Sequence, residues 1–178
     1  MSGGRIYSKI PRMLLSGGQN FSHGFISPTY GSLTFDAMFE RLMGYASENG
    51  GQRYRLIIGT DSFLNSETLF VSAVIIHKIG HGGRYFYKKT HHRKIESMRQ
   101  RIFYETTMSI ELASLIREKL DANGFSKIQL EIHLDVGTNG DTKEIIKEVV
   151  GMVTGSGYPA VTKPDSFGAS KVADRHSR

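Results

Sequence analysis

The chain has 178 residues, no cysteine and a formal net charge of +6. This length suffices for one domain with a hydrophobic core, and the lack of cysteine excludes disulfides and thiolate metal sites. No run of about 18 apolar residues occurs, which excludes a membrane-spanning helix, so we expect a cytoplasmic protein with no membrane partner. The positive charge permits a polyanionic partner such as nucleic acid but does not require one.

The chain shows little periodicity before residue 34. We expect residues 1–20, which are rich in Gly and Ser, to form a flexible leader, and residues 21–32 to form a turn-rich arm. Thr34 is a suitable N-cap for a helix, because apolar residues recur from Phe35 to Met43 at helical spacing. No repeat, linker or change of composition divides residues 21–178, so we expect them to form a single domain.

Three strands are expected next. Tyr54–Thr60, Thr68–Ile79 and Arg84–Thr90 are rich in aliphatic and aromatic residues, and Gly80-His81-Gly82-Gly83 is typical of a hairpin turn. Consecutive strands joined by short turns form an antiparallel meander.

Helices and strands alternate through the rest of the chain. We expect a long helix over Ile95–Leu120, a strand over Lys127–Val136, a helix from Asp141 to Val153, a short strand over Tyr158–Lys163 and a final helix that starts at Pro164-Asp165-Ser166. This order predicts an α/β fold with a mixed five-stranded sheet, in which the first three strands are antiparallel. Helices flank the sheet, and an N-terminal helical extension precedes it.

Two of the expected strands end in an aspartate close to a glycine. They carry Leu56-Ile57-Ile58-Gly59-Thr60-Asp61 and His133-Leu134-Asp135-Val136-Gly137. A carboxylate at the end of a buried strand is costly to desolvate unless a cation or a hydrogen-bond donor meets it. Asp61 alone is also compatible with a simple turn cap, but two such strands in one small domain indicate the two sides of a metal site.

The long helix carries one glutamate that points toward the core. At about 100° per residue, Glu105 falls within or at the margin of the apolar stripe, whereas Glu111 and Glu118 fall on the far side. Glu105 either joins the acidic site, or it snorkels at the edge of the stripe or pairs with a neighbouring arginine.

Basic residues gather between the third strand and the long helix, and again in the final helix. Lysine and arginine there can contact a nucleic-acid backbone. His91 and His92 would point to opposite faces of a strand, so we interpret them as turn residues, with a proton shuttle as the alternative. Asp165 is a plausible helix cap, and its own neighbours place Asp174 on the surface.

Several motifs occur in the same order as in the YkuK family of predicted ribonuclease H-like proteins, which the chain resembles over about residues 25–178. The matching residues are Ser27-Pro28-Thr29, Leu33-Thr34-Phe35, Ile58-Gly59-Thr60-Asp61-Ser62, His133-Leu134-Asp135-Val136-Gly137, Asn139-Gly140-Asp141-Thr142-Lys143, Lys163-Pro164-Asp165-Ser166-Phe167, Ala169-Ser170 and Ala173-Asp174.

The resemblance implies a ribonuclease H-like fold and a catalytic, metal-binding site. That site would comprise Asp61, Glu105, Asp135 and Asp174, with Asp165 as the other candidate for the fourth acidic position. The expected nucleic-acid contacts are Lys88, Lys89, Arg93, Lys94, Lys171 and Arg175.

Oxygen ligands without cysteine favour Mg²⁺ or Mn²⁺ over Zn²⁺. We therefore expect a metal-dependent nuclease that acts on RNA, an RNA–DNA hybrid or structured DNA. The alternative is a non-catalytic nucleic-acid-binding or protein-interaction module that retains the ribonuclease H-like fold.

Overall fold

A computed structural model describes residues 24–48, 53–137 and 143–177, which form one mixed sheet and four helices. The strands are β1 (Phe25–Ser27), β2 (Gly31–Leu33), β3 (Tyr54–Leu64), β4 (Thr68–Lys78), β5 (Gly82–His92), β6 (Gln129–His133) and β7 (Ala160–Val161). The helices are α1 (Phe35–Ser47), α2 (Met98–Ala122), α3 (Lys143–Gly155) and α4 (Gly168–His176). The strand order is β2-β1-β5-β4-β3-β6-β7.

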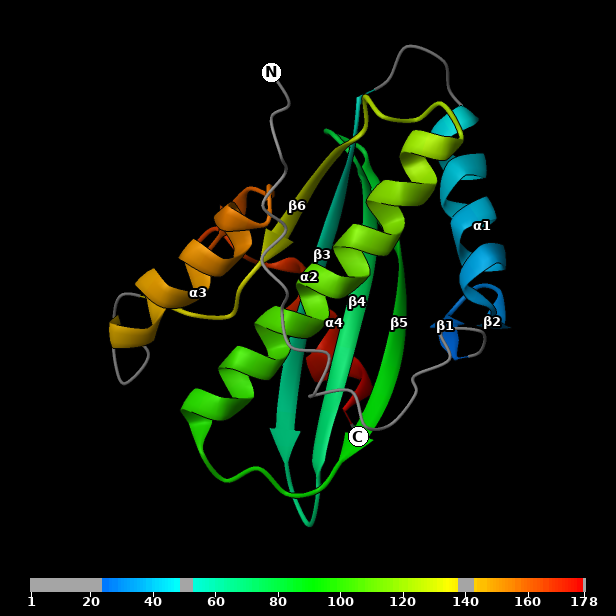
Figure 1. Ribbon diagram of the computed structural model, residues 1–178. Helices are drawn as coiled ribbons and strands as arrows, with labels where there is room; N and C mark the ends of the chain where they lie inside the picture. The colour runs from blue at the N-terminus through cyan, green and yellow to red at the C-terminus, as the bar shows by residue number, and fades with distance from the viewer. Residues whose placement is uncertain (1–23, 49–52, 138–142, 178) are drawn as a thin grey trace, which may run out of the picture.

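Helices cover both faces of the sheet. The helices α1, α2 and α3 lie on one face and α4 lies on the other, behind the strands in Figure 1. Successive strand residues point to opposite faces. Ile58 and Val74 therefore pack under α1–α3, while Val71 and Ala73 pack against α4. Burial on both faces explains why these strands are continuous apolar runs.

The sheet has seven strands, not the five that we expected from the sequence. The additional strands, β1 and β2, come from the arm at residues 21–32, and β1 pairs with β5 through Phe25↔Lys88 and Ile26↔Tyr87. Ser27 stabilises the tight turn by accepting hydrogen bonds from the backbone of Thr29 and Tyr30. This hairpin covers an edge of β5 that would otherwise leave backbone groups unpaired.

The antiparallel meander is confirmed, but β3 and β5 are longer than predicted, whereas β4 ends one residue earlier than predicted, at Lys78. β3, β4 and β5 each have eleven residues. As a result, Asp61 lies within β3, three residues before its end. His91 and His92 are the last two residues of β5, so their interpretation as turn residues was wrong. Pairing continues to Thr68↔His92 because no Gly or Pro interrupts either strand there.

The helix starts also differ from the sequence predictions in two places. α2 begins at Met98, where Ser97 accepts a hydrogen bond from the Gln100 backbone, so Glu105 lies in its second turn. α4 begins at Gly168 without a side-chain cap, and Asp165 lies in the preceding turn. The predicted cap at Thr34 is confirmed by its bond from the Ala37 backbone.

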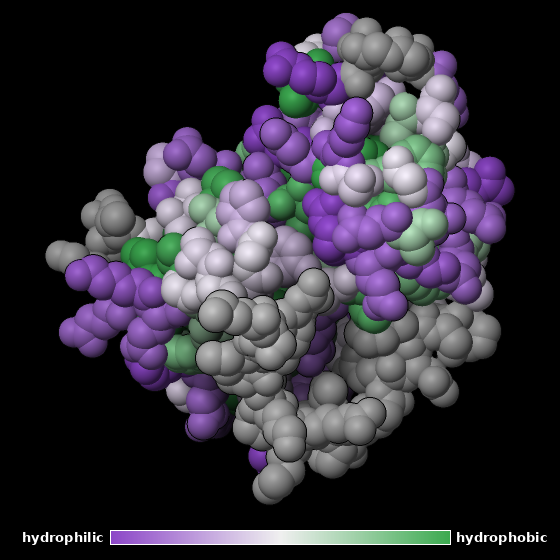
Figure 2. Space-filling model, turned by 45° about the horizontal axis from the view of Figure 1, so that its top comes forward, coloured by the Kyte–Doolittle hydropathy of each residue, from purple (hydrophilic) through white to green (hydrophobic). Residues whose placement is uncertain are grey.

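Two sequence predictions fall outside the described residues: the flexible leader at residues 1–20 and the start of a helix at Asp141. Within the part of the chain that the structure describes, no helix combines the length and apolarity needed to cross a membrane. In the view of Figure 2, hydrophilic residues cover much of the described surface, and apolar residues form small areas among them.

Candidate functional site

Asp61 lies on β3, and Asp135 follows the neighbouring parallel strand β6 by two residues. The pairing between β3 and β6 runs from Arg55↔Gln129 to Ile58↔Ile132. The same register, continued by three residues, brings Asp135 level with Asp61. Because side chains at one register position share a sheet face, both carboxylates belong to the α4 face.

A lysine lies beside Asp135, just beyond the end of the next strand, β7. The pairing between β6 and β7 includes His133↔Val161, and a backbone hydrogen bond from Lys163 to Val136 carries the contact beyond both strands. The register then places Lys163 level with Asp135. Its Nζ lies 2.8 Å from Asp135 Oδ1, with the two side chains 52% and 23% exposed. The bond to Asp135, reinforced by the charges of Asp61 and Asp174, raises the pKa of Lys163.

The sequence analysis did not identify Lys163 as a member of the site. The available signal was its position as the last residue of the expected fifth strand, because the ends of neighbouring parallel strands meet at one edge of a sheet.

Asp174 reaches the aspartates from α4. This helix packs on the sheet through Val172 and Ala173, which leaves Asp174 exposed beside them. The pKa of Asp61 is raised to about 6, first by burial, then by the charge of Asp135 and also by that of Asp174. The structure thus places Asp174 within electrostatic reach of Asp61, whereas its own sequence neighbours indicated only a surface residue.

Glu105 approaches from the other face of the sheet. Its Oε1 accepts a hydrogen bond of 2.5 Å from the hydroxyl of Ser62, the neighbour of Asp61 on β3. Burial raises the pKa of Glu105 to about 8, and the charges of Asp61 and Asp135 add to this effect. β3 runs on beyond the end of β6 (Figure 1), so an acid on the α2 face can interact with both aspartates there.

Buried hydroxyl groups hold this part of α2 against the sheet. Ser109 donates to Thr60 at 3.0 Å, and the hydroxyls of Thr60 and Ser72 lie 2.9 Å apart. Ser109 also bonds to the backbone carbonyl of Glu105 at 2.8 Å. The hydrogen-bond partner of the Glu105 carboxyl is therefore Ser62, while the charge of the neighbouring Arg101 also acts on this carboxyl and lowers its pKa.

A buried histidine fixes the start of α4. His133 Nδ1 accepts a hydrogen bond from the Phe167 backbone at 3.2 Å, so the ring proton is on Nε2, which lies 2.8 Å from Glu131 Oε1. Glu131 also bonds to Arg55 at 3.1 Å. Burial lowers the pKa of His133, which favours the neutral ring that this arrangement requires.

The described residues contain no group of three His, Asp or Glu side chains that could hold a metal ion as they stand. The chemistry of the donors nonetheless fits a divalent cation. Their oxygens are the ligands that Mg²⁺ and Mn²⁺ prefer. Burial and mutual repulsion raise the pKa values of Asp61 and Glu105, and a bound cation would relieve that repulsion. Asp165 is exposed in the turn before α4.

The predicted basic residues divide between two faces, because neighbouring strand residues alternate. Lys89 is in register with Val71 and Asp61 and therefore lies on the α4 face, where Lys171 and Arg175 are exposed. Lys88 points toward α2, and burial lowers its pKa. The segment between β5 and α2 carries the remaining predicted contacts, Arg93 and Lys94.

Comparison with known proteins agrees with this architecture. A family model described as "Ribonuclease H-like" matches residues 37–178. The chain is 32% identical over 166 residues to "Uncharacterized protein YkuK" of Bacillus subtilis (strain 168), and the match covers 86% of this chain and 96% of that protein. No solved structure matches the chain significantly.

Proposed function

Because the chain belongs to the ribonuclease H-like family, we propose that it is a metal-dependent nuclease that hydrolyses phosphodiester bonds in RNA, RNA–DNA hybrid or structured DNA. One observation carries this proposal. The register of β3 and β6, continued past the end of β6, brings Asp135 level with Asp61, and the charges of Asp135 and Asp174 both act on Asp61. Carboxylates from distant parts of the chain are thus held on one face of the sheet.

Asp61, Asp135 and Asp174 are the residues that would hold a divalent ion, with Glu105 reaching them from the opposite face. Such an ion would supply activation of water and stabilisation of the leaving oxygen. Glu105 keeps its proton at neutral pH in the metal-free protein, since its pKa is raised to about 8.

Cationic side chains on the same face would orient the substrate. Lys163 already balances part of the acidic charge at Asp135. Lys89 lies two strands away from Asp61 at the same register position of the sheet. Lys171 and Arg175 are exposed on α4. These positions suit contacts to phosphates next to the scissile bond.

The nuclease proposal is tested with labelled single-stranded RNA, RNA–DNA hybrid and branched DNA in the presence of Mg²⁺ or Mn²⁺. We expect cleavage by the wild type and a loss of at least about 100-fold in Asp61→Asn and Asp135→Asn, since even outer-shell metal partners contribute 10–100-fold. Asp174→Asn should show a similar loss, and retained activity in Asp165→Asn would assign the fourth acidic position to Asp174. Asp121→Asn, at an exposed position near the end of α2, is the control and should retain activity.

A binding module without catalysis is the second candidate, supported by the excess of positive charge. It predicts salt-sensitive nucleic-acid binding that survives Asp61→Asn and Asp135→Asn. If the folded wild type binds these substrates but cleaves none of them with either metal, the module is supported and the nuclease proposal is rejected.

A further inference from the structure

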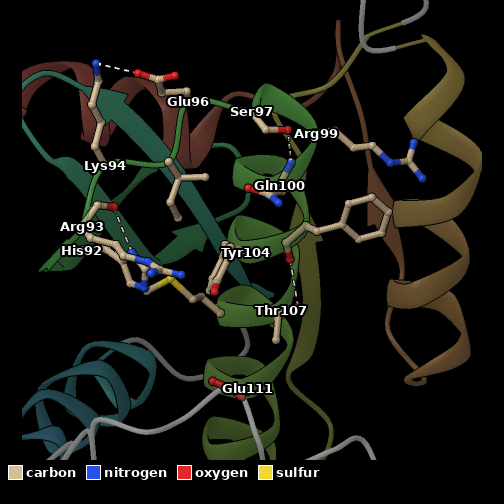
Figure 3. Close-up of a pocket in the computed structure, with 13 residues that line it drawn as sticks. His92, Arg93, Lys94, Glu96, Ser97, Arg99, Gln100, Tyr104, Thr107 and Glu111 are labelled. Carbon is tan, nitrogen blue, oxygen red and sulfur yellow. Dashed lines mark hydrogen bonds and ion pairs between the residues drawn. The ribbon is translucent and has the colours of Figure 1, made fainter.

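A pocket of about 960 Å³ lies beside the N-terminal half of α2, where the segment after β5 approaches the helix. In Figure 3, Tyr104 projects from α2 on the side where His92 and Arg93 lie, whereas Arg99 points toward α3. The part of the pocket between α2 and the end of β5 therefore combines aromatic and cationic side chains.

The aromatic wall of this part is held in place by the core. The Tyr104 ring centroid lies 5.4 Å from that of His92 and 5.9 Å from that of Phe70. Phe70 is buried, with 1% exposure, while Tyr104 and His92 remain half-buried at the pocket. A fixed, partly exposed aromatic ring is suited to stacking against a planar group.

The guanidinium of Arg93, at the pocket, has no hydrogen-bond or ion-pair partner among the described residues. Lys94 pairs with Glu96 at 3.0 Å, and Arg99 pairs with Glu148 at 2.8 Å. Arg93 is exposed, and its backbone carbonyl lies 3.0 Å from His92 Nδ1, but no described residue forms a hydrogen bond or ion pair with its guanidinium. Its guanidinium is therefore available for an anion, and phosphate is a preferred partner of arginine.

The pocket lies close to Glu105, on the face of the sheet opposite to Asp61. Phe70 pairs in register with Ser62, whose hydroxyl bonds to Glu105. Neighbouring strands are about 4.8 Å apart, and Tyr104 directly precedes Glu105 in α2. The pocket and Glu105 therefore lie next to each other on the α2 face of the sheet.

We propose that this pocket binds an unpaired nucleotide of a single-stranded nucleic acid, with the base stacked on Tyr104 and His92 and the phosphate at Arg93. Stacking on a side chain needs an exposed base face, which a continuous duplex does not offer. The inference rests on the proposed function for the link to cleavage, and it specifies the substrate class as single-stranded RNA or DNA, or a single-stranded branch of structured DNA.

The test is fluorescence anisotropy with a labelled 12-nucleotide single strand and with the blunt duplex of the same length, both in EDTA. We expect the single strand to bind at least about 10-fold more tightly. Tyr104→Leu should weaken its binding by roughly 5- to 150-fold, the range for loss of one base stack, whereas Tyr104→Phe should preserve it. A 2-aminopurine base in the strand should lose fluorescence on binding to the wild type.

Arg93→Ala provides a second variant, at an exposed position where no described contact is lost. We expect weaker binding and a decrease of about one in the salt-dependence slope. Lys127→Ala removes the same charge at an exposed site beyond the opposite end of α2 and is the control. It should bind the single strand as tightly as the wild type does. Thermal unfolding of each variant verifies that it is folded.

Equal affinity for single strand and duplex, or unchanged binding in both Tyr104→Leu and Arg93→Ala, would overturn the pocket assignment. Those results would leave the nuclease proposal standing if Asp61→Asn still abolished cleavage. Conversely, single-strand binding that depends on Tyr104 in a protein without cleavage would support the pocket and reject the nuclease.

Discussion

Lys163 places its ammonium group 2.8 Å from Oδ1 of Asp135, so a cation of the protein itself lies among the carboxylates of the site. The charges of Asp61 and Asp174 also act on this lysine. Lys163 therefore relieves part of the repulsion between acids that the sheet holds together, and a divalent ion would have to share Asp135 with it.

Replacing Lys163 with Met should raise the pKa of Asp61 above its value of about 6, because the lysine lowers that pKa through its charge. The measurement is an NMR titration of the Asp61 side-chain carboxyl in the metal-free protein. Lys127→Met, at an exposed position distant in sequence, is the control and should leave the titration unchanged. An Asp61 titration that is identical in Lys163→Met and the wild type would contradict the electrostatic role of Lys163.

Glu105 should make the metal-free protein less stable as pH rises. Its pKa is raised from 4.5 to about 8 in the folded protein, so the folded state binds more protons than the unfolded state between these pH values. The stabilisation by this proton is complete below pH 4.5 and is lost as pH rises through 8.

Glu105→Gln isolates this effect because the amide is neutral at every pH and its oxygen can accept the bond from Ser62. Urea midpoints measured from pH 5 to pH 9 should fall more steeply in the wild type than in Glu105→Gln. Parallel pH profiles of the two proteins would show that Glu105 is ionised throughout this range in the folded protein.

His133→Ala should loosen the start of α4. It removes the acceptor for the Phe167 backbone and the partner of Glu131, and leaving buried polar groups unpaired costs about 1–3 kcal/mol. We expect lower stability in urea and faster hydrogen exchange over residues 167–176. His81→Ala, at the exposed hairpin turn, should change neither quantity. Unchanged exchange of α4 in a destabilised His133→Ala protein would argue against the anchoring role.

Gly168 should be required for close packing of α4 on the sheet. A Cβ at this position would lie 2.7 Å from Cδ1 of Ile75 and 3.1 Å from Cγ2 of Ile57. Gly168→Ala should therefore cost about 1–3 kcal/mol, the usual range for overpacking.

Gly151 is the matched control, because it lies inside α3 with no atom within 4 Å of an added Cβ. Gly151→Ala should stabilise the protein by up to about 1 kcal/mol through helix propensity. Equal effects of the two substitutions on the free energy of unfolding would show that α4 can move away from the sheet without cost.

The order of the main elements could be predicted because it depends on local patterns. The apolar runs of β3 and β4, the cap at Thr34 and the stripe on α2 each involve residues close together in the chain. The hairpin of β1 and β2 was missed because its strands have only three residues each and are stabilised by pairing with β5. Such short strands carry too little periodicity to be recognised alone.

The residue types of the acidic site, the strand that carries Asp61 and the strand that leads to Asp135 follow from the sequence itself, since a carboxylate in or next to a buried apolar strand is conspicuous wherever it occurs. The tertiary structure alone decided that Lys163 meets Asp135, that Ser62 holds Glu105, and that the basic residues divide between two faces. These relationships depend on strand register and on which helix covers which face, and residues far apart in the chain determine both.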